Sequence, residues 1–219
     1  MQETMVARRT YGRDSVEFAR TLTFTDGLFA IAMTLLVVDL AVPTLAHDSS
    51  VHELADKLGD DSEKFISFFI SFAVIGRYWL AHHTYFSALA RIDRALIALN
   101  LLYLAFIAFL PFPTALLGEY FSNPLSIVIY AVNVAIVSGM EVVLFAWAHD
   151  HDLLERKLPR DVYRYGAAMS LAPVLFFVLS IPVAFISTTL AVCCWFLGIP
   201  LAAIAQRWKP EGADELLLG

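Results

Sequence analysis

Six long apolar runs dominate this chain of 219 residues, and they limit what it can fold into more than any motif does. A helix crosses the hydrocarbon core of a bilayer with about 20 mostly apolar residues, so each run is long enough to span a membrane. Only 16% of the residues are charged, well below the share in soluble domains. The sequence predicts an all-α integral membrane protein with a single domain, residues 1–219. Its six predicted transmembrane helices occupy about residues 19–43, 63–82, 92–117, 124–148, 162–186 and 187–207.

Basic residues are distributed very unevenly between the predicted loops. With six spans, all 15 Lys and Arg residues except Lys57 and Lys64 fall on one side of the membrane. Loops rich in Lys and Arg remain in the cytoplasm, so we expect both termini to be cytoplasmic and the acidic segment 44–62 to lie outside. A signal peptide is not expected, because the first run follows an arginine-containing polar stretch and has no clear cleavage site. These features indicate a multi-pass protein of the cell membrane.

The first run separates into two faces when it is drawn as a helix of 100° per residue. One face, which we call the apolar stripe, carries large apolar side chains within about 60° of one another, with a threonine on its flank. Its members are Phe24, Ile31, Leu35 and Val38, flanked by Thr34. Asp26 falls on nearly the opposite face. Aliphatic residues at helical spacing usually face lipid or a protein core, so this periodicity by itself does not identify a pore.

A carboxylate at the position of Asp26 needs hydrogen-bond donors, because ionisable groups are costly in the membrane interior. Trp79, His82, His83 and Asn100 supply suitable donors at a similar depth in the second and third spans. We interpret Asp26 as a buried, hydrogen-bonded anchor within its own subunit. Direct contact of Asp26 with a permeating ion is the alternative.

The remaining polar residues favour no catalytic chemistry. Adjacent histidines on a helix point about 100° apart, so His82 and His83 are poorly placed to share a metal ion. Motifs for a nucleophilic serine or for a phosphate-binding loop are absent from the sequence. We therefore expect no enzyme activity, no cofactor, no bound metal and no nucleic-acid partner.

Residues 20–27, with the sequence RTLTFTDG, resemble the R-x-x-x-F-S-D signature of the transmembrane-protein-175 family of endosomal and lysosomal potassium channels. Further similar elements are the W-x-x-H-H pattern of Trp79, His82 and His83, followed by Asn100 and by the sequence LPF at 110–112. Thr25 stands where serine is usual, and it keeps the hydroxyl group. The chain is similar to prokaryotic members of this family, which have one six-helix unit.

This resemblance implies a homotetramer in which the first helix of each subunit lines a potassium-permeable pore. It assigns the hydrophobic constriction to Ile31, with apolar rings at Leu35 and Val38, and the selectivity layer to Thr34. It also implies a signature network of Arg20, Phe24, Thr25, Asp26, Trp79, His82 and Asn100. Such a channel lacks the TVGYG filter of other potassium channels, and no such segment occurs here. The expected partners are the lipid bilayer, further copies of the chain and potassium ions.

Two other functions remain open on the sequence. A proton-coupled or small-substrate secondary transporter could use Asp26, Glu141 and the His82/His83 pair as a relay. A membrane scaffold without transport activity is the third possibility. Ion flux through liposome membranes separates all three.

Overall fold

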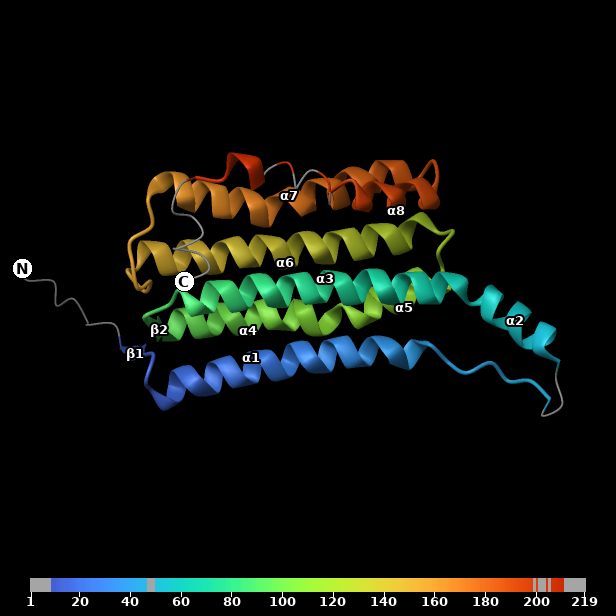
Figure 1. The fold of residues 1–219 in the computed structure, drawn as a ribbon, viewed down its shortest axis with the longest axis horizontal. Coiled ribbons are helices and arrows are strands. Elements are labelled where there is room, and N and C mark those ends of the chain that lie inside the picture. The colour runs from blue at the N-terminus through green and yellow to red at the C-terminus, as the bar shows by residue number, and fades with distance from the viewer. Residues whose placement is uncertain (1–8, 47–49, 199, 201–203, 205, 211–219) are drawn as a thin grey trace, which may run out of the picture.

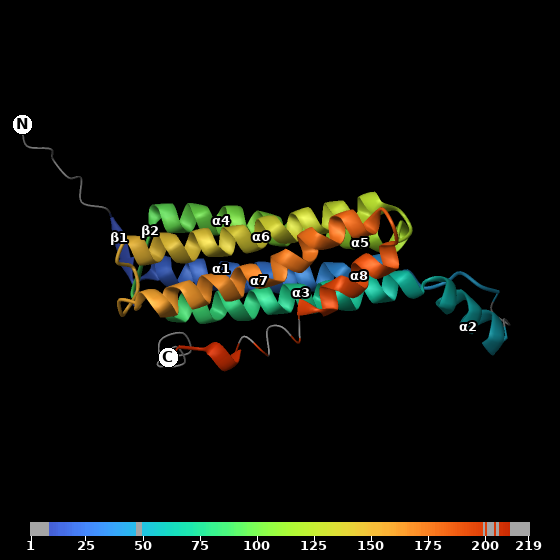
Figure 2. The same ribbon diagram turned by 90° about the horizontal axis from the view of Figure 1, so that it is seen from above.

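The computed structural model describes residues 9–46, 50–198, 200, 204 and 206–210. Its long helices lie side by side along one axis of the molecule (Figures 1 and 2). The described elements are, in chain order, β1 (Thr10–Gly12), α1 (Val16–Leu35), η1 (Leu36–Asp39), α2 (Val51–Asp60), α3 (Ser62–Ser87), β2 (Arg91–Asp93), α4 (Arg94–Phe109), α5 (Pro111–Glu119), α6 (Pro124–Asp150), α7 (Arg160–Ala184), α8 (Thr188–Phe196) and η2 (Gln206–Trp208).

Five stretches of the described residues are long and apolar enough to cross a membrane. They are Val16–Asp39, Ser62–Ser87, Arg94–Glu119, Pro124–Asp150 and Arg160–Ala184, and they correspond to the first five predicted runs. The sixth predicted run, 187–207, contains α8, a helix of nine residues. Residues 199, 201–203 and 205 of that run lie outside the described residues. The chain is therefore mostly helical with several apolar helices, as predicted, while the count of six spans stays a prediction.

Helix α1 begins at a defined cap and presents a buried face to its neighbours. The Ser15 hydroxyl accepts a hydrogen bond from the backbone N–H of Phe18, which satisfies one of the free donors at the helix start. Buried side chains then recur at helical spacing along the face that packs into the bundle. They are Phe18, Thr25, Phe29, Ala32 and Leu36.

The third predicted run contains two helices instead of one. Helix α4 ends at Phe109, and α5 starts at Pro111. A proline has no N–H to continue the hydrogen-bond ladder, and its ring crowds the preceding turn. Leu110 tightens the junction by donating to the carbonyl of Ile107 at 3.1 Å. The two pieces remain in line as one span in Figure 1.

Hydrogen bonds from three α3 residues that are spaced seven apart join this helix to α6. Such bonds between membrane helices stabilise packing where water cannot compete for the polar groups. Partner numbers rise together along both helices, so α3 and α6 run in the same direction, as alternating crossings require. The pairs are Ser71 with Tyr130 at 3.0 Å, Tyr78 with Ser138 at 2.6 Å, and Tyr85 with the carbonyl of Leu144 at 2.6 Å.

Three segments distant in sequence meet at one end of the bundle. Strand β1 pairs antiparallel with β2, and Ala90 donates to the carbonyl of Leu153 at 2.9 Å. An ion pair between Arg13 and Glu155 ties the N-terminal segment to the loop after α6. At the opposite end, α2 projects beyond the other helices (Figure 1). Helix α2 begins at a capping box that Ser50 and Glu53 form.

Candidate functional site

A chain of three buried side chains fastens α1 to α3 and α4. The Asn100 side-chain nitrogen donates to the Thr25 hydroxyl oxygen at 2.9 Å, and Asn100 Oδ1 lies 2.9 Å from His82 Nε2. The Thr25 hydroxyl in turn donates to the carbonyl of Thr21 at 2.9 Å. Because all three side chains are buried, these bonds replace water entirely for the groups that make them.

Asp26 has a separate partner. Trp79 Nε1 donates to Asp26 Oδ1 at 3.0 Å, and both residues are partly buried. His83, the other donor considered for this carboxylate, is exposed and stacks on the Trp79 ring at 5.6 Å. Trp79 therefore supplies the bond to Asp26, whereas His82 and Asn100 join Thr25. Thr25 and Asp26 of α1 thus make two separate hydrogen-bonded contacts with α3 and α4.

Aromatic packing surrounds the buried histidine. The His82 ring stacks on Phe86 with the ring centroids 4.1 Å apart, and on Tyr103 at 5.6 Å. Phe29 of α1 packs against two of these rings, with its ring centroid 5.9 Å from that of His82 and 6.2 Å from that of Tyr103. This cluster holds the inner face of α1 against α3 and α4, so its rotation about its own axis is fixed.

The outer face of α1, which η1 continues through Val38, is exposed among the residues that the structure describes. The exposed fractions of the stripe side chains are 54% for Phe24, 60% for Ile31, 46% for Leu35 and 70% for Val38. Thr34 on its flank is also exposed, and its hydroxyl donates to the carbonyl of Ile31 at 2.9 Å. The predicted division of α1 into an anchored face and an apolar stripe is thus the division between its buried and exposed sides.

Arg20 and Phe24 lie apart from this anchor. Both are exposed on α1, and they line a cavity of about 680 Å³ between α1 and α4, with Asn100 in its wall. Among the described residues, no hydrogen bond or ion pair joins Arg20 to another signature residue. The predicted role of Arg20 and Phe24 in a signature network remains a prediction.

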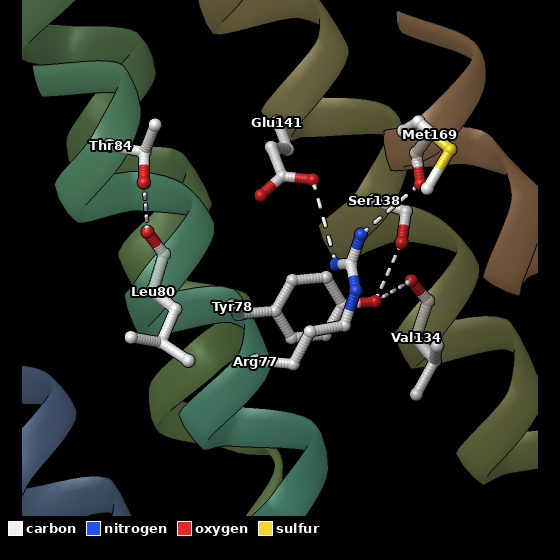
Figure 3. Close-up of polar contacts among 8 residues, drawn as sticks. All are labelled: Arg77, Tyr78, Leu80, Thr84, Val134, Ser138, Glu141 and Met169. Carbon is white, nitrogen blue, oxygen red and sulfur yellow. Dashed lines mark hydrogen bonds and ion pairs between the residues drawn. The ribbon is translucent and has the colours of Figure 1, made fainter. Parts of the chain in front are cut away.

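An ion pair between α3 and α6 was not predicted from the sequence. Arg77 was predicted at the cytoplasmic end of the second span, 63–82, and counted with the cytoplasmic basic residues. Helix α3 continues to Ser87, so Arg77 lies ten residues before the helix end. Arg77 Nη1 is 3.8 Å from Oε2 of the buried Glu141 on α6, and Nη2 donates to the carbonyl of Met169 on α7 at 3.3 Å (Figure 3). The sequence offers one signal for the contact between Arg77 and Met169. Pro173 has no N–H to donate to the Met169 carbonyl four residues before it, so that carbonyl can accept from a side chain.

Comparisons with known proteins settle the relationship that this geometry suggests. Residues 20–111 match the family described as endosomal/lysosomal potassium channel TMEM175. Over 204 residues the chain is 34% identical to a potassium channel of Chamaesiphon minutus. This alignment covers 85% of this chain and 94% of that protein. The chain belongs to the TMEM175 family. The predicted resemblance is confirmed, and the chain is an integral membrane protein.

Two further comparisons place the chain within the TMEM175 family. It is 45% identical over 104 residues to a potassium channel of Streptomyces collinus, an alignment that covers 48% of this chain and about half, 49%, of that protein. The crystal structure of a lysosomal potassium-selective channel TMEM175 homolog from Chamaesiphon minutus superposes with a TM-score of 0.71 at 31% identity. That match covers 87% of this chain and 99% of the other. Because this family consists of ion channels, the prediction that the chain is not an enzyme is confirmed.

Proposed function

We propose that the chain forms a potassium-permeable cation channel in which α1 of four copies lines one central pore. The observation that carries the proposal is the unburied apolar stripe of α1, opposite a face that hydrogen bonds hold to α3 and α4. Four such stripes around one axis would form stacked apolar rings. The relatives named as potassium channels support potassium as the permeant ion.

The side chains of the stripe suit a gate and a selectivity layer without a TVGYG filter. Rings of Ile31, Leu35 and Val38 would make a narrow hydrophobic constriction, which can gate by dewetting. Thr34 gives its hydroxyl proton to the Ile31 carbonyl, so the lone pairs of its oxygen remain free as acceptors. An oxygen with free lone pairs is the group that replaces water around a potassium ion.

We place the channel in the cell membrane with six spans and with both termini in the cytoplasm. The first strand, the segment after α3 and the loop after α6 meet at one end of the bundle, which supports a common side for these segments. Basic residues gather in the same segments, in agreement with a cytoplasmic location. The lipid bilayer and three further copies of the chain would be its lasting partners, with potassium ions passing through and no cofactor.

A secondary transporter receives no particular support from the contacts. Asp26 and His82 belong to the contacts around α1, whereas Glu141 pairs with Arg77 between α3 and α6. Among the described residues no hydrogen bond connects these two groups into a relay. A transporter would show saturable flux that is lost in Asp26→Asn, whereas a channel would conduct along the electrochemical gradient without saturating in the same way.

Potassium flux from liposomes that contain purified protein tests the proposal, with sodium flux as the ion control. We expect Ile31→Ala to widen the constriction and to raise potassium flux severalfold or to reduce discrimination against sodium. Val132→Ala on α6 is the matched control, because Val132 is an aliphatic side chain of similar exposure, 45%, outside the stripe. Equal flux in the wild type, in Ile31→Ala and in Val132→Ala would contradict a pore lined by α1.

A further inference from the structure

A pocket of about 340 Å³ lies between α3, α6 and α7, away from α1. Arg77 and Glu141 lie at one end of its wall, and along α3 the wall continues through Ala81 to Ala88. The eleven helical steps from Arg77 to Ala88 extend about 16 Å, so the pocket is elongated along the bundle. Leu80, which is 60% exposed, forms part of its rim, and the pocket therefore opens on the outside of the bundle.

The two charges at the end of the pocket are incompletely satisfied. Neither Glu141 oxygen nor Arg77 Nη1 has a hydrogen-bond partner of acceptable geometry among the described residues, although the Ser170 hydroxyl lies beside the carboxylate. The Arg77 to Glu141 separation of 3.8 Å is too long for a direct hydrogen bond. Buried polar atoms without partners are rare in native proteins, so a bound group that supplies those partners is the simplest explanation.

The orientation of Arg77 leaves one nitrogen available to such a group. Its Nη2 donates to the carbonyl of Met169 at 3.3 Å, a carbonyl for which the residue four positions later, a proline, has no N–H to offer. Figure 3 shows the guanidinium between Glu141 and Met169, with Nη1 toward the carboxylate. The arginine is therefore held by α7 while Nη1 and the Glu141 oxygens remain as a donor and acceptors beside the pocket.

We propose that this pocket binds a single-chain amphiphile whose head is a neutral hydroxyl group. A hydroxyl donates one hydrogen bond and accepts others, so it can bond to Glu141 and to Arg77 at the same time. The pair is neutral as a whole, and a charged head would meet one like charge at close range: an amine would face Arg77, and a carboxylate would face Glu141. A neutral head meets no such repulsion.

The rest of the pocket suits an apolar chain. Leu80, Ala81 and Phe145 provide apolar wall, and Gly166 leaves room where a larger side chain would intrude. Its volume falls within the range of ligand pockets, and it is too large for a single bridging water. The surrounding bilayer supplies amphiphiles at high concentration. No α1 residue lines the pocket, so this inference does not depend on the proposed pore.

Photolabelling in lipid vesicles tests the site with an octanol that carries a diazirine beside its hydroxyl-bearing carbon, so that the reactive group lies near Glu141. We expect a saturable adduct at Glu141, identified by mass spectrometry of peptides, while labelling of the exposed Glu119 rises linearly with probe concentration. Excess octanol should reduce the Glu141 adduct about tenfold. Octanoate and octylammonium at equal membrane concentration should compete about tenfold more weakly than octanol. Each charged head can bond to only one of Glu141 and Arg77, and the loss of one hydrogen bond to a charged group weakens binding by about that factor.

Filling the pocket provides the second arm of the experiment. Ala81→Phe should abolish saturable labelling at Glu141, whereas Ala105→Phe on the exposed side of α4 should leave it unchanged. Gly166→Val replaces Ala81→Phe if that variant does not fold, because a Cβ at Gly166 would meet the Phe145 ring at an ordinary distance of 3.5 Å. Linear labelling of Glu141, or equal competition by the charged octyl compounds, would overturn the proposal.

Discussion

Two groups of buried polar side chains lie within the same bundle and differ in how completely they are satisfied. Around α1, the Asn100 side chain makes one hydrogen bond of 2.9 Å to the Thr25 hydroxyl and another of 2.9 Å to the His82 ring. The polar atoms that make these two bonds therefore have partners within the subunit. Between α3 and α6, Arg77 and Glu141 are 3.8 Å apart and leave three atoms without partners. The difference separates a structural anchor, which is complete within one subunit, from a site that is complete only with something bound.

The same comparison explains the two sides of α1. A helix whose polar residues are all satisfied on one face can leave its other face free for another partner. In contrast, the pair on α3 and α6 is beside a pocket and does not fasten the helices closely. Three substitutions test this contrast, and the expected loss of stability decreases from the first to the third.

Glu141→Leu should have the largest effect on stability. It leaves the Arg77 charge without a counter-charge. Removal of one partner from a fully buried ion pair costs about 3–5 kcal/mol, and because the Arg77 side chain is 38% exposed we expect the lower end, about 3 kcal/mol. The double variant Arg77→Met with Glu141→Leu should recover most of that loss, because apolar replacements of both partners are often neutral. Unfolding of the protein in mixed micelles measures both values. A double variant as unstable as Glu141→Leu would show that the pair is itself an anchor.

Asn100→Leu should have an intermediate effect. It leaves Thr25 and His82 without their shared partner, and hydrogen bonds between membrane helices contribute about 1 kcal/mol each, so we expect a loss of about 1–2 kcal/mol. A double-mutant cycle with Thr25→Val isolates the bond from the change in packing. Additive losses from the two substitutions would show that the bond does not hold α1.

Trp79→Phe should have the smallest effect of the three. The variant keeps an aromatic ring but removes the Nε1 donor to Asp26, which is partly buried and can find water in its place. We expect a loss of about 0.6 kcal/mol, the average for a hydrogen bond in a membrane protein. A loss larger than that of Asn100→Leu would reverse the order of the two contacts and make Asp26 the principal anchor.

Much of the architecture could be predicted because apolar length and helical periodicity act locally. The first five runs correspond to the observed spans, and the wheel for α1 separated its buried and exposed faces. The junction between α4 and α5 was missed because an apolar run looks the same on both sides of Pro111. The prolines were the available signal there.

Contacts between helices could not be derived in the same way, because they depend on the rotation and depth of each helix. Trp79 and Asn100 were both considered as partners of Asp26, and only Trp79 bonds to it. Arg77 was predicted near the cytoplasmic end of a span that ended at residue 82, whereas α3 continues to Ser87, so its pair with Glu141 was not predicted. The seven-residue spacing of Ser71, Tyr78 and Tyr85 indicates a common face, but not which helix faces it.

Thiol modification during potassium flux tests most directly whether the apolar stripe lines a water-filled path. Leu35→Cys and Val38→Cys would be introduced after Cys193→Ala and Cys194→Ala have removed the native thiols, with Val132→Cys as the control outside the stripe. A positively charged methanethiosulfonate reagent reacts with thiols in water, so we expect it to abolish most of the flux in the two stripe variants and to leave Val132→Cys unaffected. If the reagent left the potassium flux unchanged in all three variants, that result would contradict a pore lined by α1.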